Sequence, residues 1–115
     1  MANILIAVTG SIASYKSADL VSSLKKQGHQ VTVLMTEAAR EFIQPLTLQV
    51  LSQNPVHLDV MKEPYPDQVN HIELGKRTDL FIVVPATANT IAKLVHGFAD
   101  NMVTSTALAL PSHIP

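Results

Sequence analysis

The chain has 115 residues, a formal net charge of −1 and no cysteine. This length allows one modest domain. The near-neutral charge, without a basic block, argues against a nucleic-acid or anionic membrane surface, and the lack of cysteine excludes disulfides, thiolate zinc sites and a cysteine nucleophile within these residues. The amino-terminal sequence lacks the basic region of a signal peptide, and no apolar run approaches the roughly 20 residues of a membrane-spanning helix. We therefore expect a cytoplasmic protein.

The first part of the chain predicts a strand, a helix and a second strand. Residues 3–8 form a continuous apolar run, which is typical of a strand buried on both faces. Apolar residues then recur at helical spacing over residues 11–26, and lysines followed by Gly28 indicate where this helix ends. A second apolar run over residues 30–35 predicts the second strand.

The middle of the chain is less regular. Thr36, with a glutamate directly after it, predicts the N-cap of a helix. Pro45 interrupts that helix and begins another helical turn at its first position. Residues 52–68 contain three prolines and read mainly as a loop, with a short strand at 56–59 as one option. Residues 71–78 are a candidate for a short helix.

The last part of the chain completes an alternating pattern. Residues 79–86 predict another buried strand, and residues 87–97 and 100–110 predict two helices, the second with Asp100 or Asn101 as its N-cap. Strands and helices that alternate in this way are typical of an α/β fold. We expect a doubly wound, mostly parallel sheet with helices on both faces, a three-layer domain of the flavodoxin or Rossmann type.

We interpret residues 1–115 as one domain, with no internal repeat and no interdomain linker. A crossover helix normally returns the chain to another strand, but the last predicted helix is not followed by one. We therefore expect the domain to continue beyond Pro115.

Three turns at the carboxyl ends of the predicted strands are rich in small and hydroxyl residues: TGSIAS, MTEAA and PATANT. Ligands of doubly wound sheets bind at this edge. In the first turn, Gly10 lets the backbone approach a ligand closely and Ser11 adds a hydroxyl donor at a helix N-terminus, which suits a phosphate. Each turn alone is explained more simply by helix capping, but three converging turns favour a phosphorylated, planar ligand. A dinucleotide is disfavoured because there is no GxGxxG motif.

His71 is the candidate for proton transfer among the five histidines. It precedes a strand that runs to the same edge of the sheet, and a histidine can gain or lose a proton near neutral pH. The alternative is a solvated surface histidine. Asn89 could contact the edge of a ring or cap a helix. No pair of histidines has convincing metal-ligand spacing, so we expect no metal site.

These motifs together resemble the flavin-containing cysteine decarboxylase family. The resemblance rests on TGSIASYKS, VLMTEAAREF and the long stretch from NHIELGKRT to NMVTSTALA, and it covers nearly the whole chain. It implies FMN as cofactor, whose single phosphate needs fewer glycines than a pyrophosphate does, and it implies that His71 is the active-site histidine. The residues that match the three flavin loops of the family are Gly10, Ser11 and Ile12, then Thr36 and Ala38, then Thr87, Ala88, Asn89 and Thr90.

The resemblance also implies an activity and an assembly. The motifs are most similar to family members that decarboxylate 4′-phosphopantothenoylcysteine to 4′-phosphopantetheine in coenzyme A synthesis. Such members form homotrimers or dodecamers of trimers, and the apolar helix near residues 102–110 is consistent with an oligomer. The substrate segment and the cysteine-containing clamp that members carry further along do not occur in residues 1–115. Alternatives are a non-catalytic FMN-binding regulatory subunit, a peptide cysteine decarboxylase and a flavin prenyltransferase.

Overall fold

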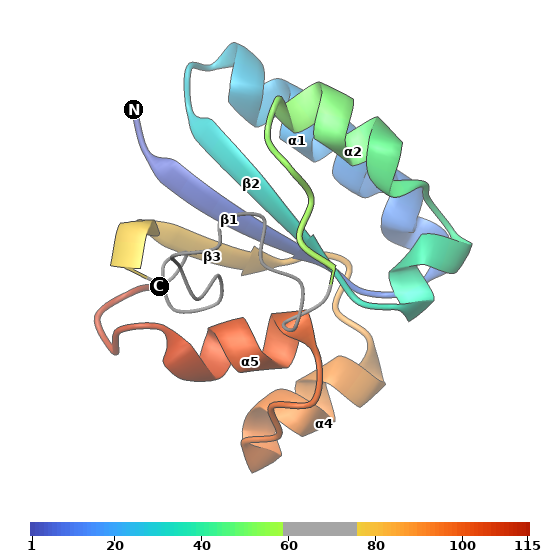
Figure 1. Cartoon of the computed structure of the whole chain (residues 1–115), viewed down its shortest axis with the longest axis vertical. Helices are drawn as coiled ribbons and strands as arrows, with labels where there is room; N and C mark the ends of the chain where they lie inside the picture. Colours follow the sequence, from blue (N-terminus) through green and yellow to red (C-terminus); the bar gives the residue numbers. More distant parts are fainter. Residues whose placement is uncertain (59–75) are drawn as a thin grey trace.

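The structure of the protein, a computed structural model, describes residues 1–58 and 76–115. Within these residues, three strands form one sheet in the order β2–β1–β3, and both pairs are parallel. The arrowheads of the three strands point toward the same edge of the sheet (Figure 1). The strands are β1 (Asn3–Val8), β2 (Gln30–Met35) and β3 (Leu80–Val83). The predicted parallel sheet is therefore confirmed.

Strand β3 is shorter than the strand predicted over residues 79–86. Val84 still donates its N–H to the carbonyl of Ala7 at 2.9 Å. Pro85 follows, and it has no N–H with which to continue the ladder. The Val84–Pro85 peptide bond is cis.

Two expectations for the middle of the chain fall partly outside the described residues. In place of the optional strand at 56–59, the described residues contain a single parallel bridge between His57 and Leu34. The short helix predicted over 71–78 lies mainly outside the described residues, which resume at Lys76.

Most predicted helices are present, with changes at their starts. The helix predicted over residues 11–26 begins as a 3₁₀ turn, and the helix predicted after Thr36 is a single 3₁₀ turn. The helical elements are η1 (Ile12–Tyr15), α1 (Lys16–Lys26), η2 (Ala38–Glu41), α2 (Pro45–Ser52), α4 (Ala88–His96) and α5 (Met102–Ala109). None of the helices among the described residues is long and apolar enough to cross a membrane.

The helix ends follow the local sequence signals. Pro45 occupies the start of α2. A backbone N–H at this position has no acceptor within the helix, so its absence in proline costs no hydrogen bond. Gly28 and Gly97 follow α1 and α4 with φ angles of +91° and +74°, a left-handed conformation that glycine adopts without strain. Asn101, and not Asp100, is the N-cap of α5, and it forms a capping box with Thr104.

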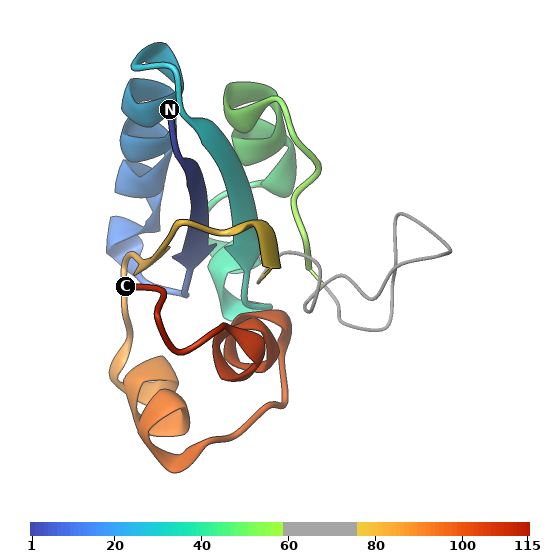
Figure 2. The ribbon, with the colours of Figure 1, turned by 90° about the vertical axis from the view of Figure 1, so that its left-hand side faces the viewer.

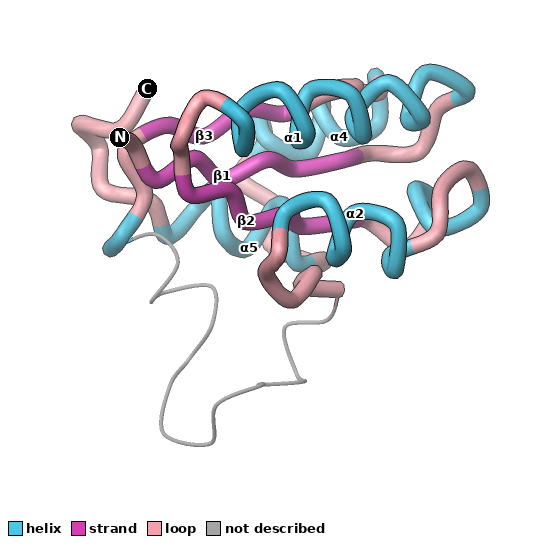
Figure 3. The backbone as a smooth tube through the Cα atoms, turned by 90° about the horizontal axis from the view of Figure 1, so that it is seen from above, coloured by secondary structure: helices cyan, strands magenta, loops and turns pink. Residues whose placement is uncertain are grey.

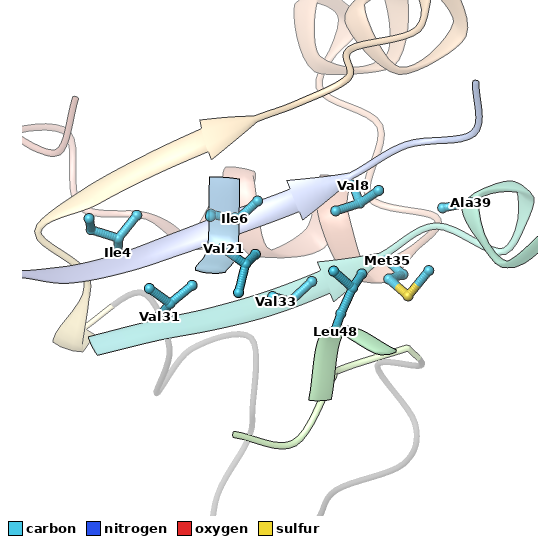
Figure 4. Close-up of a cluster of buried hydrophobic side chains, with 9 residues drawn as sticks. All are labelled: Ile4, Ile6, Val8, Val21, Val31, Val33, Met35, Ala39 and Leu48. Atoms are coloured by element: carbon cyan, nitrogen blue, oxygen red, sulfur yellow. The ribbon is translucent and has the colours of Figure 1, made fainter. Parts of the chain in front are cut away.

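Helices cover both faces of the sheet, as the three-layer expectation requires. Side chains of a strand alternate between faces, and one face packs against α1 and α2, whereas the other packs against α5 (Figure 1). Helix α4 lies beyond the end of β3 and packs on α5 (Figure 2). The buried cluster under α1 and α2 is drawn in Figure 4 and consists of Ile4, Ile6, Val8, Val21, Val31, Val33, Met35, Ala39 and Leu48.

The strand order creates a switch point at the central strand. From β1 the chain passes through α1 to β2 on one side, and it later places β3 on the other side of β1. Loops that leave two neighbouring strands in opposite directions leave room for a ligand between them. Both chain termini lie at the other end of the sheet (Figure 3). The edge where the three loops meet is therefore the place to look for a site.

Candidate functional site

A cleft of about 670 Å³ lies at the carboxyl edge of the sheet. Its volume falls in the range of about 300–1,000 Å³ that is typical of ligand pockets. All three predicted loops contribute to its wall, so the structure brings them together as expected. The predicted binding residues that line it are Gly10, Thr36, Ala38, Thr87, Asn89 and Thr90.

A smaller cavity of about 280 Å³ lies near the amino ends of the strands and includes Asn3, Gln30 and Thr78. None of the predicted site residues among those described lines it. Ligands of parallel sheets bind at the carboxyl ends of the strands. We therefore take the larger cleft as the candidate site.

Thr9, the first residue after β1, ties the β1 loop to the β3 loop. Its side chain is completely buried. The Thr9 hydroxyl donates to the carbonyl of Pro85 and accepts the N–H of Thr87 at 3.0 Å. On the other side, the Ser14 hydroxyl donates to the Thr9 carbonyl at 2.8 Å. Thr9 thus does not cap a helix, and its role as a tie between the loops was not visible in the sequence.

Gly10 holds the β1 loop against the β2 loop. A Cβ atom placed on Gly10 would lie 2.6 Å from the Cβ of Ala38 and 2.8 Å from its carbonyl carbon. Real Cβ atoms essentially never approach other atoms this closely. The sequence interpretation assigned this glycine to a close approach of the ligand. The structure shows in addition that the approach of the second loop requires it.

The β3 loop presents the start of α4 to the cleft. The Thr87 hydroxyl accepts the N–H of Thr90 at 3.2 Å and so caps the helix. The first N–H groups of the helix, at Ala88 and Asn89, have no acceptor within it. The aligned peptide dipoles add a partial positive charge at this end. Because Thr87 and Asn89 line the cleft, the loop can act both as a cap and as a binding surface.

The β2 loop presents Thr36 to the cleft. Its side chain is largely buried, and its oxygen accepts the N–H of Ala39 at 3.2 Å. The oxygen serves as acceptor in this bond, so the hydroxyl hydrogen remains a possible donor toward the cleft.

Three of the predicted binding residues do not line the cleft. Ser11 caps η1, where its hydroxyl accepts the N–H of Ala13 at 3.0 Å. Ile12 is 82% exposed, and Ala88 stands at the first position of α4. Their roles in binding stay predictions from the sequence.

Charged residues that the sequence interpretation missed also line the cleft. Glu37 and Glu41 stand on the β2 side, and Lys93 and Asp100 stand on the α4 side. The Lys93 ammonium lies 2.8 Å from a carboxylate oxygen of Asp100. The hydrogen bond from Lys93 holds the pKa of the Asp100 carboxyl below its usual value. A helical pattern could have found Lys93, because it lies one turn after Asn89 on α4.

His71 lies outside the described residues, so the structure does not place it. Among the described residues, no group of three histidine, aspartate or glutamate side chains is arranged to hold a metal ion.

A family model described as Flavoprotein matches residues 1–115. The chain belongs to the Flavoprotein family. This flavoprotein is 63% identical over 112 residues to a probable phosphopantothenoylcysteine decarboxylase of Streptococcus mutans serotype c. The match covers 97% of this chain and 63% of that protein. It is 49% identical over 107 residues to a coenzyme A biosynthesis bifunctional protein of Bacillus subtilis, covering 93% of this chain and 26% of that protein. The chain therefore spans less than two thirds of the length of both curated relatives.

The structural comparison gives the same family. The crystal structure of the FMN-dependent cysteine decarboxylase TvaF from thioviridamide biosynthesis superposes with a TM-score of 0.89 at 25% identity. The match covers 100% of this flavoprotein and 70% of that chain. The family resemblance and the fold class inferred from the sequence motifs are both confirmed.

Proposed function

We propose that this chain is the FMN-binding part of a cytoplasmic phosphopantothenoylcysteine decarboxylase, which acts in coenzyme A synthesis. The observation that carries the proposal is the cleft at the β1/β3 switch point, formed by the three predicted flavin loops. It occurs in a chain that is 63% identical to a probable enzyme of this kind. On this reading, residues 1–115 hold the cofactor, and the substrate is 4′-phosphopantothenoylcysteine.

The described residues fit the ribityl phosphate of FMN. The cleft offers a hydroxyl donor at Thr36 and an amide donor at Asn89, and the start of α4 adds free N–H groups and a partial positive charge. Gly10 and Ala38 place little side-chain bulk in the wall. A polyol with one phosphate matches such a surface in size and polarity. The two glutamates across the cleft oppose a second phosphate, which is consistent with a mononucleotide.

Ala38 is the only hydrocarbon side chain of the described lining, so few apolar side chains are available there to cover the flavin ring. We propose that a second copy of the chain covers the ring in a homotrimer, or in a dodecamer of trimers. The sequence interpretation assigned the apolar contact to α5, which buries Met102 and Val103 within its own chain and exposes Leu108. Further exposed apolar side chains lie on α4 and just beyond it, at Ile91, Val95 and Phe98.

FMN, when bound, supplies the two-electron redox chemistry that lets the carboxylate leave. The chain would bind and orient the cofactor through its three loops. His71 would move a proton or position the substrate. This role follows from its match to the family's active-site histidine, since it lies outside the described residues.

The encoded full-length protein tests this function directly. Purified protein is expected to carry FMN and to release carbon dioxide from 4′-phosphopantothenoylcysteine. His71→Asn is expected to leave FMN bound while decarboxylation falls about 10²- to 10⁴-fold, the range typical of a general acid or base. A folded protein that cannot be loaded with FMN would overturn the proposal. Nearly normal turnover in the flavin-loaded variant would overturn the role of His71.

The same assay separates the alternative functions. A similar solved structure, that of EpiD, is complexed with the substrate peptide DSYTC, so a peptide that ends in cysteine is the competing substrate. Preference for that peptide would make the chain a peptide cysteine decarboxylase. FMN binding without either turnover would favour a non-catalytic regulatory subunit, and prenyl transfer to the flavin would favour a prenyltransferase. Sedimentation of the loaded protein tests the trimer.

A further inference from the structure

The tie between the β1 and β3 loops depends on one hydroxyl group. Thr9 is completely buried, and its oxygen takes part in two hydrogen bonds, one to the Pro85 carbonyl and one from the Thr87 N–H. A second backbone contact accompanies them, because the Thr9 N–H donates to the same carbonyl at 3.4 Å. Both bonds of the hydroxyl are partly buried, and a polar group shielded from water that loses its partner carries a desolvation penalty. Removing the hydroxyl would therefore leave the Thr87 N–H without its partner, and the Pro85 carbonyl would keep only the longer bond from the Thr9 N–H.

The residue that Thr9 holds is the N-cap of α4. Thr87 accepts the N–H of Thr90, and its own N–H is fixed by Thr9. The position of Thr87 sets where the free N–H groups at Ala88 and Asn89 point. Thr9 does not line the cleft, so it acts on a ligand through the residues that it holds, and of these Thr87 lines the cleft.

The β1 side of the tie is also fixed. The Ser14 hydroxyl donates to the Thr9 carbonyl at 2.8 Å and accepts the Ser11 N–H at 3.1 Å. The Ser17 hydroxyl donates in turn to the Ser14 carbonyl at 2.6 Å, which connects the loop to α1. Thr9 is β-branched, so its χ1 angle is restricted and the hydroxyl stays aimed at the β3 loop. The two loops therefore keep one relative position.

We infer that Thr9 is a positioning residue, which fixes the start of α4 relative to the β1 loop so that the cleft is formed before the ligand arrives. This inference rests on the proposed function for the identity of the ligand, FMN, but not for the tie itself. A site that is formed in advance binds more tightly because binding does not have to order the loops.

The test replaces Thr9 in the encoded full-length protein. Thr9→Val keeps the branched shape and removes the hydroxyl, and Thr9→Ala is a second hydroxyl-free variant in case valine prevents folding. Thr9→Ser keeps the hydroxyl and is the rescue variant. FMN affinity is measured by flavin fluorescence under conditions where each variant is folded. Hydrogen exchange of the Thr87 amide is measured without FMN.

A matched control comes from α5. Thr106 is also completely buried, and its hydroxyl has no hydrogen-bond partner within the described structure. Thr106→Val makes the same chemical change away from the cleft. It is expected to leave FMN affinity and Thr87 exchange unchanged.

We expect Thr9→Val to weaken FMN binding about 10-fold, which corresponds to the loss of one to two net hydrogen bonds. Exchange of the Thr87 amide should become at least several-fold faster, and Thr9→Ser should recover most of both effects. Unchanged affinity in a folded hydroxyl-free variant would overturn the positioning role, as would failure of serine to rescue. If the wild-type protein does not bind FMN, the proposed function fails. In that case, hydrogen exchange of the Thr87 amide alone tests whether Thr9 holds the β3 loop, and unchanged exchange in Thr9→Val would overturn that role.

Discussion

The two faces of the sheet are packed to different extents. Among the residues that the structure describes, the cluster under α1 and α2 contains nine buried side chains, whereas the cluster under α5 contains five. Every residue of β1 after Asn3 is buried, but every residue of β3 is only partly buried. The stability of the described fold therefore resides mainly on the α1 and α2 side. The helices that border the cleft, α4 and α5, belong to the more weakly packed side, from which ligand-binding elements are commonly drawn.

Truncating one core residue on each face of the sheet should cause the largest losses of stability and tests whether the two faces differ. Leu48→Ala on α2 and Met102→Ala on α5 each remove a side chain that is at most 1% exposed. Such changes typically cost about 2–5 kcal/mol. We expect Leu48 at the upper end, because α1 and α2 pack on each other and cannot close the gap, and Met102 at the lower end. Urea unfolding measures both, and an equal or reversed order would contradict the comparison.

Filling the contact between the β1 and β2 loops should have the next largest effect. Gly10→Ala places a Cβ 2.6 Å from that of Ala38 and 2.8 Å from its backbone. We expect a loss of about 1–3 kcal/mol, as for overpacking of a core, together with weaker FMN binding.

The control for this change is the double variant Gly10→Ala with Ala38→Gly. It removes the contact between the two Cβ atoms but keeps the contact with the backbone of residue 38. Partial recovery of stability is expected. No recovery would mean that the side chain of Ala38 is not what Gly10 must avoid.

Removing the N-cap of α4, or that of η1, should reduce stability less than the changes above. Thr87→Ala and Ser11→Ala each remove a side chain that accepts a backbone N–H at a helix start, a change that costs about 1 kcal/mol. Helix α4 buries only Thr90, whereas η1 leads into α1, which is anchored by Val21. We expect Thr87→Ala to fray its helix more. Exchange of the receiving amides, at Thr90 and Ala13, measures this, and equal acceleration would weaken the comparison.

The ion pair at the cleft should have the smallest effect. Both partners are partly exposed, with Lys93 at 25% and Asp100 at 56%, and such pairs contribute little. The pKa of Asp100 is lowered from 3.8, chiefly by the hydrogen bond from Lys93. The small stabilisation is thus complete above the unfolded pKa and is lost as the pH falls through the folded pKa.

The measurement for the ion pair is an NMR titration of the Asp100 carboxyl. The expected pKa lies below 3.8 in the wild type and rises in Lys93→Met, which keeps an unbranched stem without the charge. A wild-type value at or above 3.8 would show that the pair does not form in solution.

The sequence predicted the features whose causes are local. Ser11, Thr87 and Asn101 cap helices because a hydroxyl or amide reaches an N–H two or three residues ahead, and that distance is visible in the sequence. The strand at residues 3–8 was predicted because apolar runs of this length are buried on both faces. The family motifs also located the three loops of the cleft.

The remaining features depend on residues far apart in the chain. The clash that requires Gly10 involves Ala38, and the bonds of Thr9 involve Pro85 and Thr87. No local pattern indicates that these positions meet, because the meeting follows from the strand order. The pairing of Lys93 with Asp100 spans only seven positions, but it depends on how the chain turns after α4.

The separation of Thr9 and Pro85, 76 positions along the chain, bears on the order in which the molecule folds. Strands β1 and β2 are close in sequence, so they can pair after a short loop closes. Pairing of β3 with β1 requires a much longer loop to close, and the entropy lost in that closure is compensated only when the strands pair. We therefore expect the cleft to be completed late in folding, after the core under α1 and α2 has formed. A cofactor that recognises this cleft selects chains that have finished folding and, by mass action, draws the others toward that state.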